Sequence, residues 1–227
     1  DYDITTGARP QEIQQVFRQV RQDAVGIRHG TVRLCLPGGV AEVTTFRTEG
    51  GYDDSRHPGW VEFVPDVQTD LARRDFTINA IAYDRQRGLV DPFGGQTDLA
   101  QGLIRAVGDP ATRFEEDALR ILRLYRFGAR FGFAIEEKTD AAARALCSRL
   151  DCVSVERIQE ELAKLLAAPQ PGSYLVPQVM AAILPELSGQ ALTRAAPVVD
   201  ACPAGKAALP VRLAALLESL GEEGVRR

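Results

Sequence analysis

Short β-rich runs alternate with turn residues in the first part of the chain. Residues 31–36 and 40–46 carry β-branched and apolar residues on either side of Pro37-Gly38-Gly39, which predicts a β-hairpin. Residues 10–20 begin with proline and predict a helix. Weaker patterns predict strands at 1–5, 61–64 and 89–90, a helical turn at 77–83, and a loop at 48–60. The first region therefore has the pattern of an α/β domain.

From about Asp109 the hydrophobic positions follow a helical period. This predicts helices over residues 113–130, 136–146 and 154–167, and Ser154 with Arg157 and the following carboxylates predicts a capped start for the last of them. The remainder is rich in alanine and leucine and is punctuated by prolines. We therefore expect an α/β head over residues 1–108, an all-helical neck over 109–168, and part of a helical body over 169–227.

Composition narrows the class of protein. Of 227 residues, 45% are hydrophobic and 26% are charged, which is typical of a globular chain and excludes collagen-like or low-complexity sequence. Charges or prolines interrupt every long apolar run, so we expect neither a membrane span nor a signal peptide. The four cysteines are too scattered for a disulfide framework or a zinc site, which favours a reducing cytoplasm.

The charge composition gives a weaker indication of whether the protein binds nucleic acid. The net charge of −4 argues against a general nucleic-acid-binding protein. The positive charge is nearly all arginine, which suits phosphates and base edges, although a GC-rich genome would also produce it.

A pair of acids opens the chain. Asp1 and Asp3 are two residues apart, so on a strand their side chains share one face and repel each other unless a cation lies between them. Mg²⁺ is the usual cation for such oxygen ligands, and two ions can hold an attacking and a leaving oxygen in line. Glu42, on the second strand of the expected hairpin, is a candidate third ligand. The alternative is a strand end and a strand residue that face solvent.

Two adjacent arginines and an aspartate precede the apolar turn at 77–83. Arg73 and Arg74 are suited to triphosphate oxygens through charge-assisted hydrogen bonds. Asp75 is suited to accept a hydrogen bond from a ribose hydroxyl. The alternative is a local ion pair beside a helix start.

Asp117 and Arg120 are three residues apart on the expected helix 113–130, away from its apolar face. One interpretation is an intrahelical ion pair. The other is base recognition, because an acceptor beside a donor matches the amino group and ring nitrogen of cytosine and of adenine. Guanine and uracil would leave both contacts unpaired, which disfavours them. The apolar face is formed by Ala118, Ile121, Leu122, Tyr125 and Ala129.

Six ordered motifs resemble the class II tRNA nucleotidyltransferases, the bacterial CCA-adding enzymes, and the poly(A) polymerase heads that share their core. They span about residues 1–168. The motifs are Asp1-Tyr2-Asp3-Ile4-Thr5-Thr6, Glu42-Val43-Thr44-Thr45-Phe46-Arg47, Arg73-Arg74-Asp75-Phe76-Thr77-Ile78-Asn79-Ala80, Asp91-Pro92-Phe93-Gly94-Gly95, Glu116-Asp117-Ala118-Leu119-Arg120-Ile121-Leu122-Arg123 and Ser154-Val155-Glu156-Arg157-Ile158.

The resemblance implies an enzyme that adds C, C and A to the 3′ end of tRNA from CTP and ATP with Mg²⁺. It implies a head with a mixed sheet like that of DNA polymerase beta. Asp1 and Asp3 would be the catalytic metal ligands, with Glu42 as a further candidate. The resemblance implies nucleotide-binding roles for Arg73, Arg74, Asp75, Asn79, Asp117, Arg120 and Arg123.

Several activities share these motifs. The relatives that add only C residues lack a flexible loop that the run Tyr52-Asp53-Asp54-Ser55-Arg56-His57-Pro58 resembles, so full CCA addition is favoured over CC addition. A-only addition and poly(A) synthesis stay open, because the base-reading pair admits adenine in each case. Two further alternatives are a non-catalytic RNA-binding relative and a helical interaction protein whose charges are surface ion pairs.

Some features of the family are not found in this sequence. A Gly-Gly and Arg-Asp motif that holds the triphosphate precedes the acids in the family, and we expect it upstream of Asp1 in the natural protein. The tail that grips tRNA is not recognised here. His29 and His57 are the only histidines, so a His–Asp phosphohydrolase domain is not expected. The sequence leaves the oligomeric state open.

Overall fold

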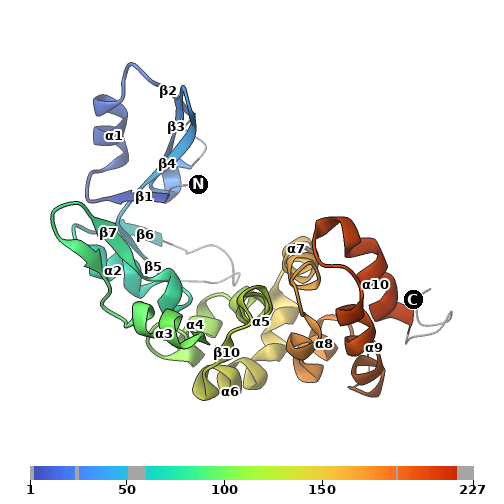
Figure 1. Ribbon diagram of the computed structural model, residues 1–227. Helices are drawn as coiled ribbons and strands as arrows, with labels where there is room; N and C mark the ends of the chain where they lie inside the picture. The colour runs from blue at the N-terminus through green and yellow to red at the C-terminus, as the bar shows by residue number, and fades with distance from the viewer. Residues whose placement is uncertain (1–2, 24–25, 51–59, 188, 219–227) are drawn as a thin grey trace.

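A computed structural model describes residues 3–23, 26–50, 60–187 and 189–218. Figure 1 shows a β-rich head at one end, helices α7 to α10 at the other, and helices α4 to α6 between them. The mixed α/β head and helical neck that the sequence predicts are therefore confirmed. No helix in the described ranges is both long and apolar enough to cross a membrane.

A four-stranded mixed sheet forms the tip of the head. Its order is β1-β4-β3-β2, with β1 parallel to β4 and the other neighbours antiparallel. Helix α1 covers one face and contributes Ile13 to a small core with Val32, Leu34 and Val43. The predicted hairpin is confirmed as β3 and β4, and the predicted helix is shorter than expected. The elements are β1 (Asp3–Thr6), α1 (Pro10–Val16), β2 (Arg21–Asp23), η1 (Ile27–His29), β3 (Thr31–Leu36) and β4 (Gly39–Thr45).

The rest of the head connects this sheet to the neck. Strands β5 and β6 form an antiparallel pair, so the loop predicted over 48–60 is wrong at both ends. Gly50 pairs with Trp60 and has no side chain, which leaves room for the indole ring against its backbone. The elements are β5 (Arg47–Gly50), β6 (Trp60–Phe63), α2 (Val67–Ala72), η2 (Thr77–Asn79), β7 (Ala82–Asp84), β8 (Gly88–Val90), α3 (Gly95–Gln101) and β9 (Leu103–Ile104).

The neck and body are helical, apart from the two-residue strand β10 that pairs with β9 of the head. Helices α6 and α7 confirm two of the predicted helices. Ser154 precedes α7, but its side chain makes no capping hydrogen bond, so the predicted cap is wrong. The elements are α4 (Pro110–Glu116), α5 (Leu119–Phe131), β10 (Ala134–Ile135), α6 (Glu137–Ala145), η3 (Cys147–Cys152), α7 (Val155–Leu166), η4 (Gly172–Tyr174), α8 (Pro177–Ile183), α9 (Gly189–Ala201), η5 (Lys206–Ala208) and α10 (Leu209–Glu218).

The single helix predicted over 113–130 is two helices, α4 and α5. Asp117 ends α4 with an extended backbone, and its Oδ1 accepts a hydrogen bond from the backbone N–H of Leu119 at 3.1 Å. Aspartate often competes in this way with the helical hydrogen bonds of its own backbone. The break turns the Asp117 side chain away from the position that an unbroken helix would give it.

One buried cluster joins head and neck. Phe76 and Ile104 of the head pack with Phe114 of α4 and with the apolar face of α5, including Leu122 and Tyr125. The predicted core side of α5 is confirmed, since these side chains are buried. Because the two regions share one core, residues on η2 and α5 are held in fixed positions relative to one another.

Candidate active site

A cavity of about 550 Å³ lies where head and neck meet. It brings together eight of the residues predicted for the site, and it adds Leu119, Phe127 and Arg157. Five guanidinium groups and three carboxylates line it, an excess of positive charge that suits a polyphosphate. The eight predicted residues are Asp3, Arg73, Arg74, Asp75, Asn79, Asp117, Arg120 and Arg123.

The acidic edge of the site lies on the head sheet. The register of β1 and β4 places Asp3 directly beside Glu42, as the prediction of a third acid requires. Asp3 is exposed, whereas Glu42 forms an ion pair with Arg33 at 2.7 Å. Asp1 lies outside the described residues, and among those described no three His, Cys, Asp or Glu side chains are close enough to hold a metal ion.

Arg73 and Arg74 follow helix α2, and the buried Asp70 of that helix holds both. Asp70 accepts from Arg73 at 2.9 Å and lies 3.7 Å from Arg74. Arg74 also donates to the carbonyl oxygen of Asn79. The predicted alternative of a local ion pair is therefore present, and both arginines also line the cavity.

Asp75 joins the head to helix α5. Its Oδ1 accepts from the N–H of Phe76 and from Asn79 Nδ2, and its Oδ2 accepts from Arg123 at 2.6 and 2.8 Å. Burial alone raises the pKa of Asp75, but Arg123 and Asn79 outweigh it and hold that pKa below its usual value. Burial alone lowers the pKa of Arg123, but Asp75 outweighs it and raises that pKa. The carboxylate is thus fixed in its charged form.

Contacts between η2 and its neighbours fix the position of Asn79, the last residue of that turn. Thr77 donates to Asp98 at 2.7 Å, and Arg105 binds the same carboxylate at 3.1 Å. At Gly95, on the first turn of α3, a Cβ would stand 2.1 Å from the carbonyl oxygen of Thr77. Only glycine allows α3 to approach η2 this closely.

Asp117 does not pair with Arg120 in this structure. Its Oδ2 accepts from Arg157 Nη2, on helix α7, at 2.8 Å. The predicted intrahelical pair between Asp117 and Arg120 is therefore wrong, because the break between α4 and α5 removes the helical spacing. Both side chains still line the same cavity.

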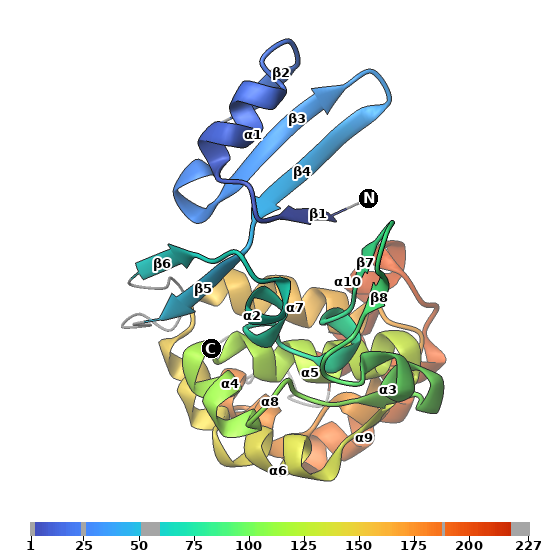
Figure 2. The same cartoon turned by 90° about the vertical axis from the view of Figure 1, so that its left-hand side faces the viewer.

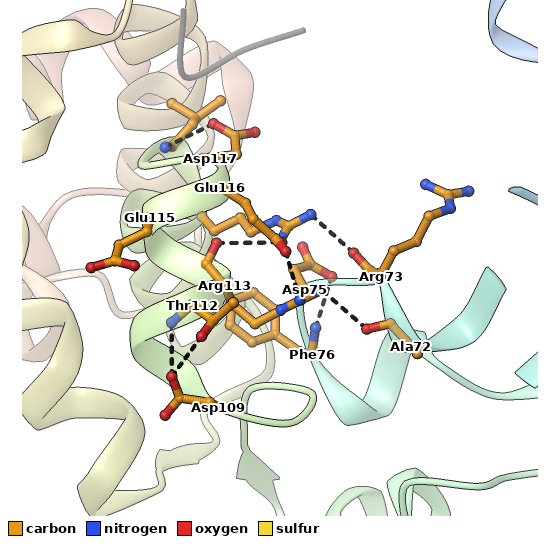
Figure 3. Close-up of polar contacts among 12 residues, drawn as sticks. Ala72, Arg73, Asp75, Phe76, Asp109, Thr112, Arg113, Glu115, Glu116 and Asp117 are labelled. Atoms are coloured by element: carbon orange, nitrogen blue, oxygen red, sulfur yellow. Dashed lines mark hydrogen bonds and ion pairs between the residues drawn. The ribbon is translucent and has the colours of Figure 1, made fainter. Parts of the chain in front are cut away.

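Arg120 belongs to a network that joins the neck to the end of α2. Glu116 accepts from Arg113 at 2.6 Å and from Arg120 at 2.7 Å. Figure 3 shows the Glu116 carboxylate on the side of the neck that faces Ala72 and Arg73 of the head. Arg113 donates to the carbonyl oxygen of Ala72, and Arg120 donates to that of Arg73. These contacts fix Arg120 beside the arginines that follow α2.

Sequence reasoning missed three residues that line the cavity. Arg157 was assigned to a helix cap, although its place in an ordered motif could have indicated a role in the site. Leu119 also stands in an ordered motif, whereas no sequence pattern indicated Phe127. Phe127 packs edge to face on Phe76, with ring centroids 5.8 Å apart, and Arg126 lies over its ring.

Comparison with known sequences agrees with the resemblance. Residues 1–105 match the family "Poly A polymerase head domain", and residues 132–188 match "Probable RNA and SrmB-binding site of polymerase A". The CCA-adding enzyme of Lactobacillus helveticus is 49% identical over 169 residues, which are 74% of this chain and 42% of that protein. That of Leuconostoc citreum is 46% identical over 189 residues, 83% of this chain and 46% of that protein. The chain thus spans less than half the length of these relatives.

Comparison with solved structures gives the same result. The Bacillus stearothermophilus CCA-adding enzyme in complex with CTP is 36% identical and superposes with a TM-score of 0.79 over 96% of this chain and 53% of that one. The Thermotoga maritima CCA-adding enzyme complexed with tRNA is 25% identical, with a TM-score of 0.68 over 100% of this chain and 56% of that one. With the ordered motifs and the shared head and neck, these matches show that the chain belongs to the family of class II CCA-adding enzymes and poly(A) polymerase head domains.

Proposed function

We propose that this chain is the head, neck and part of the body of a tRNA nucleotidyltransferase that adds C, C and A to the 3′ end of tRNA from CTP and ATP. The observation that supports this most strongly is the single cavity that gathers an exposed acid, five arginines and Asp117. The arginines suit the phosphates of a nucleoside triphosphate, and Asp117 suits the base at its other end. The proposed substrates imply a cytoplasmic protein.

The phosphates would lie against Arg73 and Arg74. Asp70 already holds these guanidinium groups, so little side-chain entropy is lost when a triphosphate binds. The Arg74 guanidinium, which is 32% exposed, keeps further N–H donors for phosphate oxygens.

The ribose would lie beside Asn79 and Asp75. All four acceptor positions of the Asp75 carboxylate are occupied in this structure, by Phe76, Asn79 and the two bonds from Arg123. A ribose hydroxyl that reaches Asp75 would therefore replace one of these donors. Asp75 also sets the positions of Arg123 and Asn79.

The residues at the acidic edge fit Mg²⁺. Asp3 is exposed, lines the cavity and lies in register with Glu42, so these oxygens, together with Asp1, would hold the ions. Mg²⁺ at these oxygens would supply positive charge that activates the RNA 3′ hydroxyl and stabilises the leaving pyrophosphate. Arg33 neutralises Glu42, which makes Asp3 the stronger ligand of these two.

The base would contact Asp117 and Arg120. Among the described residues, Asp117 accepts only from Leu119 and Arg157, and Arg120 donates to Arg113, Glu116 and Arg73. The carboxylate therefore keeps acceptor positions, and the guanidinium keeps N–H donors, for a cytosine or adenine. Both groups are held in place by protein partners, so a base with the wrong donor pattern leaves buried polar atoms unpaired. This would select CTP and ATP against GTP and UTP.

The test uses the complete natural protein with Mg²⁺, labelled nucleotides, and tRNA that lacks its last three nucleotides. We expect CTP to be added twice and ATP once. Addition of C alone, of A alone to tRNA ending in CC, or of long A tails would identify the corresponding relative instead. No incorporation by a protein whose circular dichroism shows an intact fold would contradict the enzyme and support a non-catalytic relative.

A further inference from the structure

Helix α5 presents a face that continues beyond the cavity. Arg123 and Phe127 line the cavity, and Arg126, Arg130 and Phe131 follow on the same side because they are three to eight residues further along the helix. From Arg123 to Arg130 the axis rises by about 10 Å. Anything that leaves the cavity along α5 therefore passes these residues.

A second groove, of about 580 Å³, lies along this face between α5, α7 and the η5–α10 segment. Its floor is apolar, with Ala163, Ala167 and Leu209. Figure 1 shows α5 between the head and helices α7 and α10, so the groove lies on the body side of the neck. Its charged lining consists of Arg126, Arg130, Lys164, Lys206 and Glu160.

The positive charge of this groove is only partly neutralised. Arg126 and Lys164 both bind the buried Glu161, at 2.5 and 3.0 Å. Arg130 and Lys206 form no ion pair with any residue that the structure describes. The groove therefore presents cations that suit an anionic ligand.

An exposed aromatic ring lies at the end of α5. Phe131 is 44% exposed, and its ring stacks on that of Phe127 with centroids 5.9 Å apart and planes 8° apart. The guanidinium of Arg130 lies over the Phe131 ring at 5.5 Å. An aromatic surface thus begins inside the cavity at Phe127 and reaches solvent at Phe131, beside the guanidinium of Arg130.

We propose that Phe131, Arg130 and Lys206 form a track that binds the unpaired 3′ end of the RNA as it leaves the cavity. A base stacks on Phe131, and the phosphates that follow contact Arg130 and Lys206. Stacked aromatic rings beside a basic groove are the combination that binds single strands without reading their sequence. The proposal rests on the proposed function, because it assumes that an RNA 3′ end occupies the cavity. The ring stack from Phe127, which lines the cavity, to the exposed Phe131 favours a strand that leaves the cavity over a second nucleotide.

The test compares two RNA hairpins, one blunt and one with an unpaired 3′ CC, bound to the complete natural protein. Phe131→Ala should weaken binding of the overhanging hairpin about tenfold and leave the blunt hairpin unchanged. The double variant Arg130→Ala/Lys206→Ala should reduce the slope of log affinity against log salt by about 1.4 for the overhanging RNA. Equilibrium dialysis should show unchanged affinity for CTP in every variant.

Matched controls lie on the other side of the molecule. Tyr83→Ala removes a ring that is 73% exposed on β7, and Arg85→Ala/Lys138→Ala removes two exposed cations. Figure 1 shows β7 and α6 away from α10. These controls should bind both hairpins within twofold of the parent.

Four results would overturn the track. The track is wrong if the Phe131 and Arg130/Lys206 variants bind the overhanging hairpin with the affinity and salt slope of the parent. That result would leave RNA binding by the protein intact. Equal losses on the blunt hairpin would show that the unpaired end is not the ligand. A loss of CTP affinity would assign the groove to the nucleotide. Failure of the parent to bind either hairpin would overturn the RNA substrate of the proposed function together with the track.

Discussion

The two walls of the cavity differ in how their charged groups are held. On the head sheet, Asp3 is exposed at the edge of β1. On the neck side, Asp117 is held by Arg157 of α7 and Arg120 by Glu116, and Arg123 of α5 holds the buried Asp75 of the head. An exposed acid is available to a metal ion at little cost in stability, whereas a pre-positioned set of donors and acceptors can reject a wrong ligand. Substitutions on the two walls should therefore have different consequences.

The largest effect is expected at Asp3. Asp3→Asn should reduce nucleotide transfer about a thousandfold or more, because a metal ligand is lost, with little change in unfolding free energy for this exposed residue. Rates of labelled CTP incorporation and urea unfolding curves would measure both quantities. Asp151→Asn, at another exposed aspartate, is the matched control. Retained turnover in Asp3→Asn would remove the metal role.

On the opposite wall, Arg123→Ala should act mainly on stability. The change leaves the buried Asp75 carboxylate without its closest cation, so we expect a loss of about 2–3 kcal/mol in unfolding free energy. A double-mutant cycle with Asp75→Asn measures the coupling by urea unfolding. Strictly additive losses would show that the pair does not join head and neck.

Selectivity should change at Asp117. Asp117→Ala removes the acceptor, so the preference for CTP and ATP over GTP and UTP should fall by about tenfold or more. Incorporation of the four nucleotides, each supplied alone, measures this preference. Thr112→Ala, at the capped start of the same helix α4, controls for indirect disturbance of the neck. An unchanged preference in Asp117→Ala would contradict base reading by this side chain.

The sequence predicted well which residues lie close together. It predicted less well which hydrogen bonds and ion pairs they form. Periodicity placed Leu122 and Tyr125 of α5 in the core, and strand pairing brought Asp3 beside Glu42. Arg157 comes from a helix that lies forty positions along the chain from Asp117, so no local pattern reveals that contact. The break at Asp117 depends on one side-chain hydrogen bond that competes with the helix, which periodicity does not detect.

The smallest effect is expected from pH. The pKa of Asp75 is lowered in the folded protein, so its charged form stabilises the fold at every pH above the unfolded value of 3.8, and this contribution is lost as the pH falls through the lower folded value. Unfolding free energy measured between pH 7 and pH 3 should therefore fall less in Asp75→Asn than in the parent, and the difference should develop only below about pH 4. The loss at acid pH should not exceed that of Arg123→Ala at pH 7, because protonation leaves a neutral hydrogen-bonded group where the substitution leaves a buried charge. Parallel pH profiles in Asp75→Asn and the parent would show that this carboxylate is not held by Arg123 in the folded protein.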